Sequence, residues 1–503
     1  MPSVEHCDIA PGVTLPRILN GLWQVADLER DGRQINLDHA ASAMQPYVDA
    51  GLTGFDMADH YGSAEDIAGI FGSRGDRQRV QWCTKWVPQP GPLTRDDVRA
   101  AVQRSLKRLR TERVDLMQFH AWYFADPAWL DALFYLQELR DEGLIGALGV
   151  TNFDTAHLRI ALTSGIRLVS NQVSHSLIDQ RAAGRMAALC AEHGVRILAY
   201  GTVCGGFLSR RWLDAPEPSW ERLDTWSQMK YGRFIRAAGG WHQLQQVLRT
   251  LDGIANRHQV SMTNVASRYM LDQPHVAAII VGVRLGVSEH TAENLRVFSF
   301  TLSDADRAEI RATLAALSAV PGDCGDEYRR PPFLTASGDL SHHLSTFPAP
   351  FPVRADASGR QRVLSGTSWE TTYGYARALR TGNRILVSGT TASHGDRLIG
   401  GHDASAQMHF VLDKIEGAIR SLGGQLEDIV RTRVMVSALR DWEAVAQAHG
   451  DRLGSVQPAN TLVQTTLVGD DFLVEVEAEA EVSVAAGDGR QAAPLLDEPP
   501  QSG

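Results

Sequence analysis

"VQWCTKWVPQPGPLTRDDVRAAVQRSLKRLRTERVDLMQFHA", residues 80–121, is the stretch that decides the fold class. It holds two short, mostly apolar runs, 80–86 and 114–121, separated by a segment whose apolar residues recur at spacings of three and four. Thr94 opens that segment as a suitable helix N-cap, with acidic residues in the first turn. The stretch therefore predicts a strand, a helix and a second strand in succession, which is the repeating unit of a parallel sheet.

The same alternation of apolar runs and helical patterns extends over about the first 300 residues. Eight buried strands alternating with helices are the sequence form of a (β/α)8 barrel. A doubly wound open sheet is the alternative, but it usually shows a glycine fingerprint after its first strand, where this chain reads "NGLWQV". We therefore predict an α/β chain with a (β/α)8 TIM barrel, whose other strands lie within 18–25, 51–58, 145–152, 168–173, 196–203 and 276–283.

A second unit follows a change in composition. Residues 320–354 are rich in Pro, Gly, Ser and His, which is typical of a barrel tail and a linker. Beyond them the patterns read strand, strand, helix, strand, helix, strand, strand, with a hairpin turn at the "TGN" of 381–383. This order predicts an α+β unit with its helices on one face of a sheet. The expected boundaries are 1–345 for the barrel, 346–485 for the second unit and 486–503 for a disordered tail.

Composition and charge exclude several classes of function. The chain has 503 residues and a net charge of -10, so a basic nucleic-acid-binding face is not expected. Neither a secretory leader nor an apolar run of about 18–20 residues is present, which predicts a cytoplasmic protein without a membrane span. Five scattered cysteines without a C-x-x-C pair favour a reducing compartment and no metal site. They are Cys7, Cys83, Cys190, Cys204 and Cys324.

Polar residues occur where three successive expected strands end, which is where barrel enzymes place their catalytic groups. A lysine beside a phenol favours the phenolate and is expected to lower its pKa, while a carboxylate holds the lysine in place. An imidazole in the same site can orient a carbonyl oxygen and relay a proton. Such a set can give a proton to oxygen or nitrogen while hydride reaches the carbon, and hydride requires a nicotinamide. The residues are Asp56, Tyr61, Lys85 and His120.

The motifs "GFDMADHYGSAED", "TKW", "MQFHAW", "GVTNF", "SNQV", "LAY" and "VGVR…TAENL" resemble the aldo/keto reductase family over about residues 8–345. The resemblance implies an NADP(H)-dependent oxidoreductase acting on a carbonyl, or on the reverse alcohol or sugar, with Tyr61 as general acid of the tetrad. It also implies that Tyr200 stacks on the nicotinamide, and that Arg284 lies beside the adenosine phosphate. It further implies carboxamide binding by Thr151, Asn152 and Gln172, adenine contacts by Glu293 and Asn294, and pocket walls from Trp23, Trp86 and Trp122.

Some positions depart from this pattern. His290 stands where members that grip the 2′-phosphate usually have arginine, so NAD(H) is the alternative cofactor, although Arg284 keeps NADP(H) as the expected one. Asp59 and His60 match no catalytic position, and loop polarity or a substrate contact is their expected role. The long insertion 204–241, with its tryptophans and arginines, is either a lid over the site or a decoration packed on the rim.

The second unit resembles the Rid (YjgF-like) family, with its chorismate-mutase-like fold, over about residues 352–485. The motifs are "YGYARALRTGNRILVSGTTA", "GGQLEDIVRTRVMVS" and "QPANTLVQTTLVGDDFLVEVEAEA". The resemblance implies a trimer with clefts between subunits where enamines and imines can be hydrolysed. Asn460 stands where deaminating members have an arginine, and an amide cannot clamp a carboxylate, so that activity is not expected. Glu475 matches an acidic cleft position, but glutamates alternate with Val and Ala over 474–481, and the solvated face of a strand is the preferred interpretation. Arg433 and Trp442 are further cleft candidates.

Two classes of function follow. The first is an enzyme that reduces a carbonyl or a C=N group of a small molecule, assembled as a homo-oligomer through the second unit. The alternative is a non-catalytic cofactor-binding or scaffold protein, in which the second unit serves for trimerisation or ligand binding. The complete set of Asp56, Tyr61, Lys85 and His120 favours the enzyme.

Overall fold

A computed structural model describes residues 3–29, 32–329 and 348–483 of the chain. The expected tail at 486–503 and most of the junction between the two units lie outside these ranges. None of the helices within them has both the length and the apolar character needed to cross a membrane.

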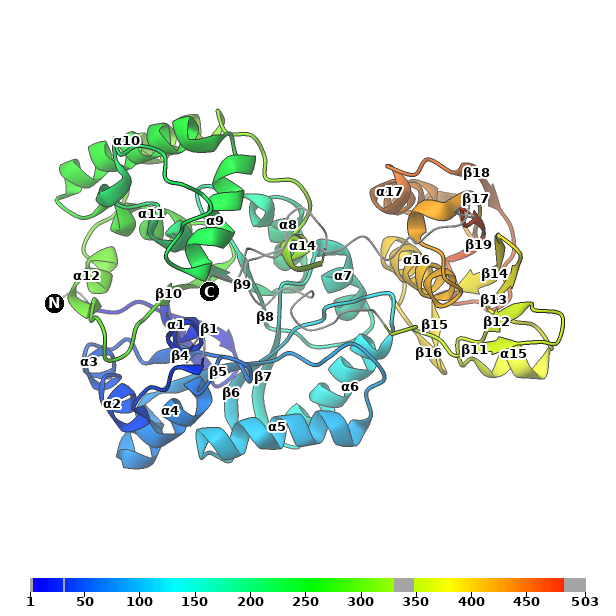
Figure 1. The fold of residues 1–503 in the computed structure, drawn as a ribbon, viewed down its shortest axis with the longest axis horizontal. Helices are drawn as coiled ribbons and strands as arrows, with labels where there is room; N and C mark the ends of the chain where they lie inside the picture. Colours follow the sequence, from blue (N-terminus) through cyan, green and yellow to red (C-terminus); the bar gives the residue numbers. More distant parts are fainter. Residues whose placement is uncertain (1–2, 30–31, 330–347, 484–503) are drawn as a thin grey trace, which may run out of the picture.

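The N-terminal unit is a closed barrel of parallel strands, as predicted (Figure 1). Each strand pairs with its sequence neighbours, and the last, β10, closes the ring by pairing Ile279 with Ile18 of the first, β3. The alternation of apolar runs and helices produces this closure because each helix returns the chain to the same end of the sheet. The barrel strands are β3 (Ile18–Gly21), β4 (Gly54–Asp56), β5 (Gln81–Trp86), β6 (Val114–Phe119), β7 (Ile145–Thr151), β8 (Ser170–Ser174), β9 (Arg196–Tyr200) and β10 (Val276–Gly282).

A short antiparallel hairpin precedes the barrel, β1 (His6–Ala10) with β2 (Val13–Pro16). Its apolar residues Ile9 and Leu15 share a buried cluster with Leu19, Leu116 and Leu198 from the barrel strands. The hairpin therefore packs against the apolar interior of the barrel, while the carboxyl ends of the strands form the site.

Helices surround the barrel, and α5 shows how the sequence sets their bounds. The Thr94 hydroxyl and the Asp97 carboxylate form a reciprocal capping box at its start, and Val98, Val102 and Leu106 are buried on one face. These helices are α1 (Trp23–Leu28), α2 (Leu37–Ser42), α3 (Gln45–Asp49), α4 (Ala64–Phe71), α5 (Arg95–Leu109), α6 (Ala128–Asp141), α7 (Thr155–Thr163), α8 (Arg185–His193), α9 (Trp226–Ala237), α10 (Gly240–His258), α11 (Met262–Leu271), α12 (Thr291–Leu295), α13 (Asp304–Leu314) and α14 (Asp326–Arg329).

The insertion 204–241 performs both of the roles weighed for it. Trp212 and Trp220 pack around Phe207, with ring centroids 5.0 and 6.0 Å from it, as a rim decoration would. Trp226, at the start of α9, instead lies 5.9 Å from the Trp23 ring and lines the cavity of the site. The insertion is thus anchored by one group of tryptophans while α9 forms a wall of the site.

The C-terminal unit is the predicted α+β domain, with one mixed sheet in the order β11-β12-β13-β14-β19-β17-β18. The hairpin expected at 381–383 joins β13 to β14, and the structure adds two strands, β11 and β12, within and after the expected linker. The strands are β11 (Val353–Ala355), β12 (Gln361–Val363), β13 (Ala378–Thr381), β14 (Arg384–Thr391), β17 (Ile429–Val436), β18 (Ala459–Gln464) and β19 (Val474–Glu481), with β15 (Ser393–His394) and β16 (Arg397–Leu398) as a separate pair. The helices are α15 (Ser368–Thr372), α16 (Ala404–Ser421) and α17 (Trp442–Leu453).

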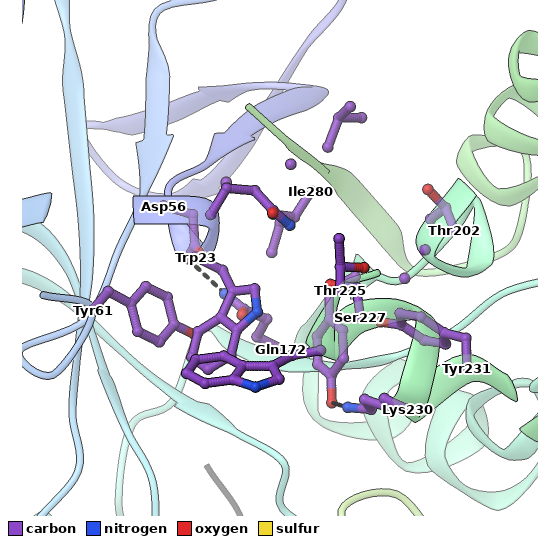
Figure 2. A pocket seen from close by; sticks show the side chains of 18 of the residues that line it. Trp23, Asp56, Tyr61, Gln172, Thr202, Thr225, Ser227, Lys230, Tyr231 and Ile280 are labelled. Carbon is purple, nitrogen blue, oxygen red and sulfur yellow. Dashed lines mark hydrogen bonds between the residues drawn. The ribbon is translucent and has the colours of Figure 1, made fainter. Parts of the chain in front are cut away.

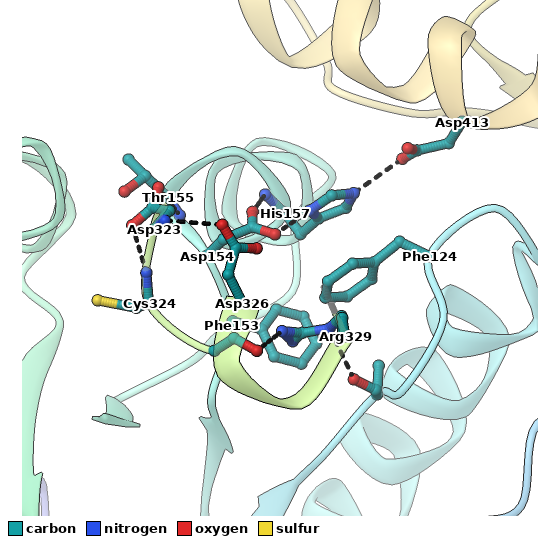
Figure 3. A network of polar contacts seen from close by, with 12 residues as sticks. Phe124, Phe153, Asp154, Thr155, His157, Asp323, Cys324, Asp326, Arg329 and Asp413 are labelled. Atoms are coloured by element: carbon teal, nitrogen blue, oxygen red, sulfur yellow. Dashed lines mark hydrogen bonds and ion pairs between the residues drawn. The ribbon is translucent and has the colours of Figure 1, made fainter. Parts of the chain in front are cut away.

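The two units meet where α16 lies beside α7 (Figure 1). Gly417 of α16 approaches the backbone of Ala125 so closely that a Cβ there would overlap the Ala125 carbonyl oxygen. Buried charges cross the interface: the His157 ring nitrogens lie 2.7 Å from Asp154 Oδ1 and 3.0 Å from Asp413 Oδ2 of the second unit (Figure 3). The interface therefore combines close backbone packing with a buried ionic contact.

Candidate active site

The predicted catalytic residues converge on one cavity of about 400 Å³ at the carboxyl ends of the barrel strands. Asp56 ends β4 and Lys85 lies near the end of β5. His120 directly follows β6, and Tyr61 hangs from the loop after β4. All four side chains line this cavity. Figure 2 shows Asp56 and Tyr61 in it, together with Trp23 and Gln172. The parallel strands bring these residues together because they deliver their carboxyl ends to the same rim.

Asp56 is the centre of a buried polar network. Its Oδ2 lies 2.5 Å from Lys85 Nζ, and both side chains are 4% exposed. Its Oδ1 accepts hydrogen bonds from Gln118 at 3.1 Å and from Gln172 at 2.7 Å. Lys85 also donates to the carbonyl of Met57 at 3.0 Å. The ammonium group is thus neutralised and fixed in direction, as a buried ion pair requires.

Tyr61 lies next to this ion pair. The Lys85 Nζ is 5.0 Å from the centroid of its ring, and the Trp23 ring packs edge-on at 4.9 Å. Burial raises the pKa of Tyr61 well above its usual value, and the Asp56 charge raises it further. The lowering expected from Lys85 is therefore not found, because burial of the phenol is the largest effect on its pKa and the Asp56 charge adds to the rise. Tyr61 is held as a protonated phenol, which is the form that can donate a proton.

His120 completes the reactive corner of the cavity. Its ring packs edge-on against Trp122, with centroids 4.3 Å apart, and against Tyr328 at 5.6 Å. Its backbone N–H donates to the Trp86 carbonyl at 3.0 Å, which continues the strand pairing to the rim. Tyr61 and His120 therefore line the same cavity.

The expected carboxamide-binding residues form the next wall of the cavity: Thr151, Asn152 and Gln172, beside Tyr200. Asn152 has a positive φ of 57°, and its backbone N–H donates to the Gln172 carbonyl at 2.8 Å. Its side-chain Oδ1 accepts a bond from the Tyr200 hydroxyl at 2.7 Å. Because Oδ1 is engaged in this way, the amide nitrogen is the donor that a ligand in the cavity would meet. Strain of this kind persists where surrounding contacts hold it, and functional sites often contain it.

Gly325, just before α14, supports this unusual backbone. It has a φ of +81°, and a Cβ there would overlap the Asn152 carbonyl oxygen. The same carbonyl accepts a hydrogen bond from Arg329 of α14. The segment that follows the barrel therefore holds the Asn152 backbone in place through its carbonyl group. Only glycine fits at position 325.

The far end of the cavity is lined by Arg284, Ser288 and His290. The Nε of Arg284 is buried and has no hydrogen-bond partner within the described ranges. A buried guanidinium nitrogen without an acceptor is suited to a phosphate oxygen, so these residues fit the phosphate end of a dinucleotide. Glu293, on α12, and Asn294 lie beyond the lining, and Glu293 Oε1 is likewise buried without a partner in the part that the structure describes.

The tryptophans expected in the pocket separate into two groups. Trp23 and Trp122 line the cavity, but Trp86 does not, and its buried ring packs against Phe119 at 5.6 Å. The expectation for Trp86 therefore needs correction: side chains alternate along a strand, so the neighbour of Lys85 points away from the barrel interior. His60 lines the cavity and pairs with Asp59 at 3.1 Å.

Sequence reasoning missed much of the lining, including Trp226 and Lys230 on α9 and Tyr328 on α14. The only available signal was their location in the insertion and in the tail after the barrel. No spacing rule connects either segment to β4, so only the folded chain could identify these residues.

The candidates in the C-terminal unit lie on three neighbouring strands, β18, β17 and β19, and at the start of α17. Asn460 Nδ2 donates to Thr432 Oγ1 at 2.9 Å, so the amide is engaged on the neighbouring strand β17. Burial raises the pKa of Glu475, and the Glu477 charge adds to this effect. Arg433 pairs with Glu477 at 3.0 Å, while the Trp442 ring is 44% exposed. None of these residues lines the cavity of the barrel.

Comparisons with known proteins support both parts of this architecture. The profile described as "Aldo/keto reductase family" matches residues 17–315, more than half of the chain, and the one described as "Endoribonuclease L-PSP", the Rid family, matches 366–482. An uncharacterized protein of Streptomyces coelicolor is 40% identical over 121 residues, covering 24% of this chain and 90% of its own. The aldo-keto reductase YhdN of Bacillus subtilis is 26% identical over 352 residues, covering 65% and 98%.

Among solved structures, a glycerol dehydrogenase of Gluconobacter oxydans aligns with a TM-score of 0.50 at 22% identity, covering 64% of this chain and 97% of its own. At this identity the likeness supports the fold alone. The two family resemblances and the barrel-plus-Rid fold predicted from the sequence are thereby confirmed.

Proposed function

The chain belongs to the aldo/keto reductase family, and from this membership we propose that it is an NAD(P)H-dependent oxidoreductase. It would reduce a carbonyl or C=N group of a small molecule, or oxidise the corresponding alcohol or sugar. The observation that carries the proposal is the buried Asp56–Lys85 pair beside a protonated Tyr61, with His120 on the same cavity.

The residues of the chain divide the proton chemistry among them. The nicotinamide cofactor supplies hydride to the carbon when it is bound. Tyr61 gives its phenolic proton to the substrate oxygen, and His120 orients that oxygen. As the phenol loses its proton, the Lys85 ammonium 5.0 Å from its ring stabilises the negative charge. Asp56 and the Met57 carbonyl keep Lys85 in this place.

Two groups of residues would hold the cofactor. Asn152 and Gln172 offer side-chain amides for the carboxamide, beside the Tyr200 ring. Arg284 supplies a buried cationic nitrogen without an acceptor in the described part of the chain, which supports NADP(H) over NAD(H). His290 near it offers a weaker second contact than arginine would, so NAD(H) is the alternative cofactor.

Replacing Tyr61 by phenylalanine tests the proposal, because the ring remains and only the proton donor is lost. We expect turnover of a panel of aldehydes, sugars and cyclic imines with NADPH to fall at least about a hundredfold. NADPH binding, followed by quenching of protein fluorescence, should be retained. A wild-type protein that binds NADPH but reduces no member of the panel would favour the non-catalytic alternative.

For the C-terminal unit we propose assembly into a trimer and the absence of arginine-dependent imine deaminase activity. The amide of Asn460 supports the second point, because it cannot form the bidentate clamp that arginine forms with a carboxylate. Light scattering of the full chain should give a mass of about three times the 55.1 kDa of one chain. A monomer at micromolar concentration would refute the trimer. A cytoplasmic location also remains a proposal, supported by the free cysteines.

A further inference from the structure

Lys230 of α9 lines the cavity (Figure 2), and together with Tyr200 and Tyr328 it forms a polar wall that the sequence did not predict. Its Nζ donates to the Tyr200 hydroxyl at 3.1 Å and to the Tyr328 hydroxyl at 2.9 Å. It also lies 3.6 Å from Glu327 Oε1, and the lysine side chain is only 10% exposed. One ammonium group therefore joins Tyr200, the residue expected beside the nicotinamide, to the neighbouring Tyr328.

The charges around Lys230 cancel. Glu327 lies 3.0 Å from Arg181, which in turn pairs with Asp179 at 2.7 Å. Although burial opposes ionisation of Glu327, Arg181 and Lys230 lower its pKa to about 2, so the carboxylate is charged. Two cations face two anions, so this wall has no net charge to offer an anionic group.

Tyr328 has an accepting role in this network, and among the described residues its own proton meets no hydrogen-bond acceptor. Its oxygen accepts the bond from Lys230, and the Tyr200 oxygen lies 3.5 Å away, at the long limit of a hydrogen bond. A phenol polarised by an ammonium group is a stronger donor than a free phenol. Its ring lies 5.6 Å from His120 and 6.1 Å from Trp122, so the phenol adjoins the reactive corner.

We propose that Tyr328, held by Lys230, donates a hydrogen bond to a second oxygen of the substrate, next to the carbonyl that Tyr61 and His120 address. The preferred substrates are then neutral hydroxy-carbonyl compounds, such as hydroxyaldehydes and open-chain sugars, rather than simple aldehydes or oxo acids. A hydroxyl suits this wall because the donor comes without net charge. The fully buried Glu327 already neutralises Lys230 from outside the cavity lining, so a carboxylate would find no surplus cation there. The inference rests on the proposed function, whose substrate class it narrows.

Tyr328→Phe tests this role, because it removes the hydroxyl and keeps the ring. The probes are glyceraldehyde and propanal, three-carbon aldehydes that differ only in hydroxyl groups, assayed with NADPH on the full chain. We expect kcat/KM to fall about tenfold for glyceraldehyde, a loss of about 1.4 kcal/mol, and less than about twofold for propanal. Lys230→Met should change the same ratio in the same direction. Tyr135→Phe on α6, away from the cavity, is the matched control and should change neither value.

Several results would overturn the inference. Equal losses for both aldehydes, or no loss for glyceraldehyde, would show that the hydroxyl of Tyr328 does not select the substrate. A wild-type preference for glyoxylate over glyceraldehyde would show that the wall serves a carboxylate. Failure of the proposed function is distinguishable, because the wild type would then reduce neither aldehyde. In that case the binding of 1,2-propanediol and of 1-propanol, each followed by tryptophan fluorescence, still tests the hydrogen bond from Tyr328. Tighter binding of the diol that Tyr328→Phe abolishes would support that hydrogen bond. A preference that Tyr328→Phe leaves unchanged would overturn it.

Discussion

Replacing Asp413 by asparagine should break the buried ionic contact between the two units. Asp413 Oδ2 lies 3.0 Å from His157 Nε2, and its Oδ1 accepts from Arg452 at 2.5 Å, with the carboxylate 2% exposed. Removing one partner of a buried ion pair typically costs about 3–5 kcal/mol, because it leaves uncompensated charge. Arg452 keeps a second partner, Glu416, at 2.6 Å, so we expect the lower end, a loss of about 3 kcal/mol.

Urea unfolding followed by circular dichroism and tryptophan fluorescence measures this loss in the full chain. The matched control is Asp451→Asn, which breaks the ion pair of 2.6 Å between Arg185 and Asp451 on the same interface. Because that arginine side chain is 68% exposed, the control should lose less than about 1 kcal/mol. Equal losses in the two variants, or a loss below about 1 kcal/mol for Asp413→Asn, would refute the reasoning.

The same contact predicts a dependence of stability on pH. Burial disfavours the charged His157 ring, but Asp154 and Asp413 outweigh it and raise the pKa of His157 above its usual value. The protonated His157 ring stabilises the folded state, and this contribution is complete below the unfolded pKa of about 6.5. It is lost as the pH rises through the higher pKa of the folded state. The free energy of unfolding of the wild type should therefore fall over that window, and the fall should be smaller in Asp413→Asn.

Further predictions concern the site. Lys85→Met should lower kcat at least about a hundredfold with little change in the KM for NADPH, and a retained kcat in steady-state assays would contradict its role beside Tyr61. Arg284→Ala should weaken NADPH binding about tenfold and NADH binding much less, and His290→Arg should strengthen NADPH binding. Fluorescence titration measures both cofactors. Equal effects on NADPH and NADH would contradict the assignment of these residues to the phosphate. Gly325→Ala should destabilise the protein by more than about 1 kcal/mol and weaken NADPH binding, since its Cβ would displace the Asn152 carbonyl; unchanged melting and binding would show that Asn152 needs no such support.

Much of the fold could be predicted because its signals are local. The run 80–86, the capped helix opened by Thr94 and the run 114–121 became β5, α5 and β6 with little change in their bounds. Local periodicity suffices here because each element buries its apolar face against its sequence neighbours. The convergence of Asp56, Lys85 and His120 could be predicted in the same way, because parallel strands bring their carboxyl ends to one rim.

Other features depended on contacts that no local pattern encodes. Trp86 illustrates one limit, because the pleat of β5 directs its side chain away from the cavity, against Phe119. The pKa of Tyr61 illustrates another: the shift is upward because the phenol is deeply buried and because the Asp56 charge lies close to it. Neither burial nor distance can be read from residue types.

The sequence by itself determined the barrel, the second domain and the residues proposed for proton transfer. Only the tertiary structure decided which residues line the cavity and how the two units are joined. Lys230 and Tyr328 lie 98 residues apart, and His157 and Asp413 lie 256 apart. Such pairs form only when the complete chain has folded, because long-range contacts gain their free energy from the packing of whole elements rather than from local propensity.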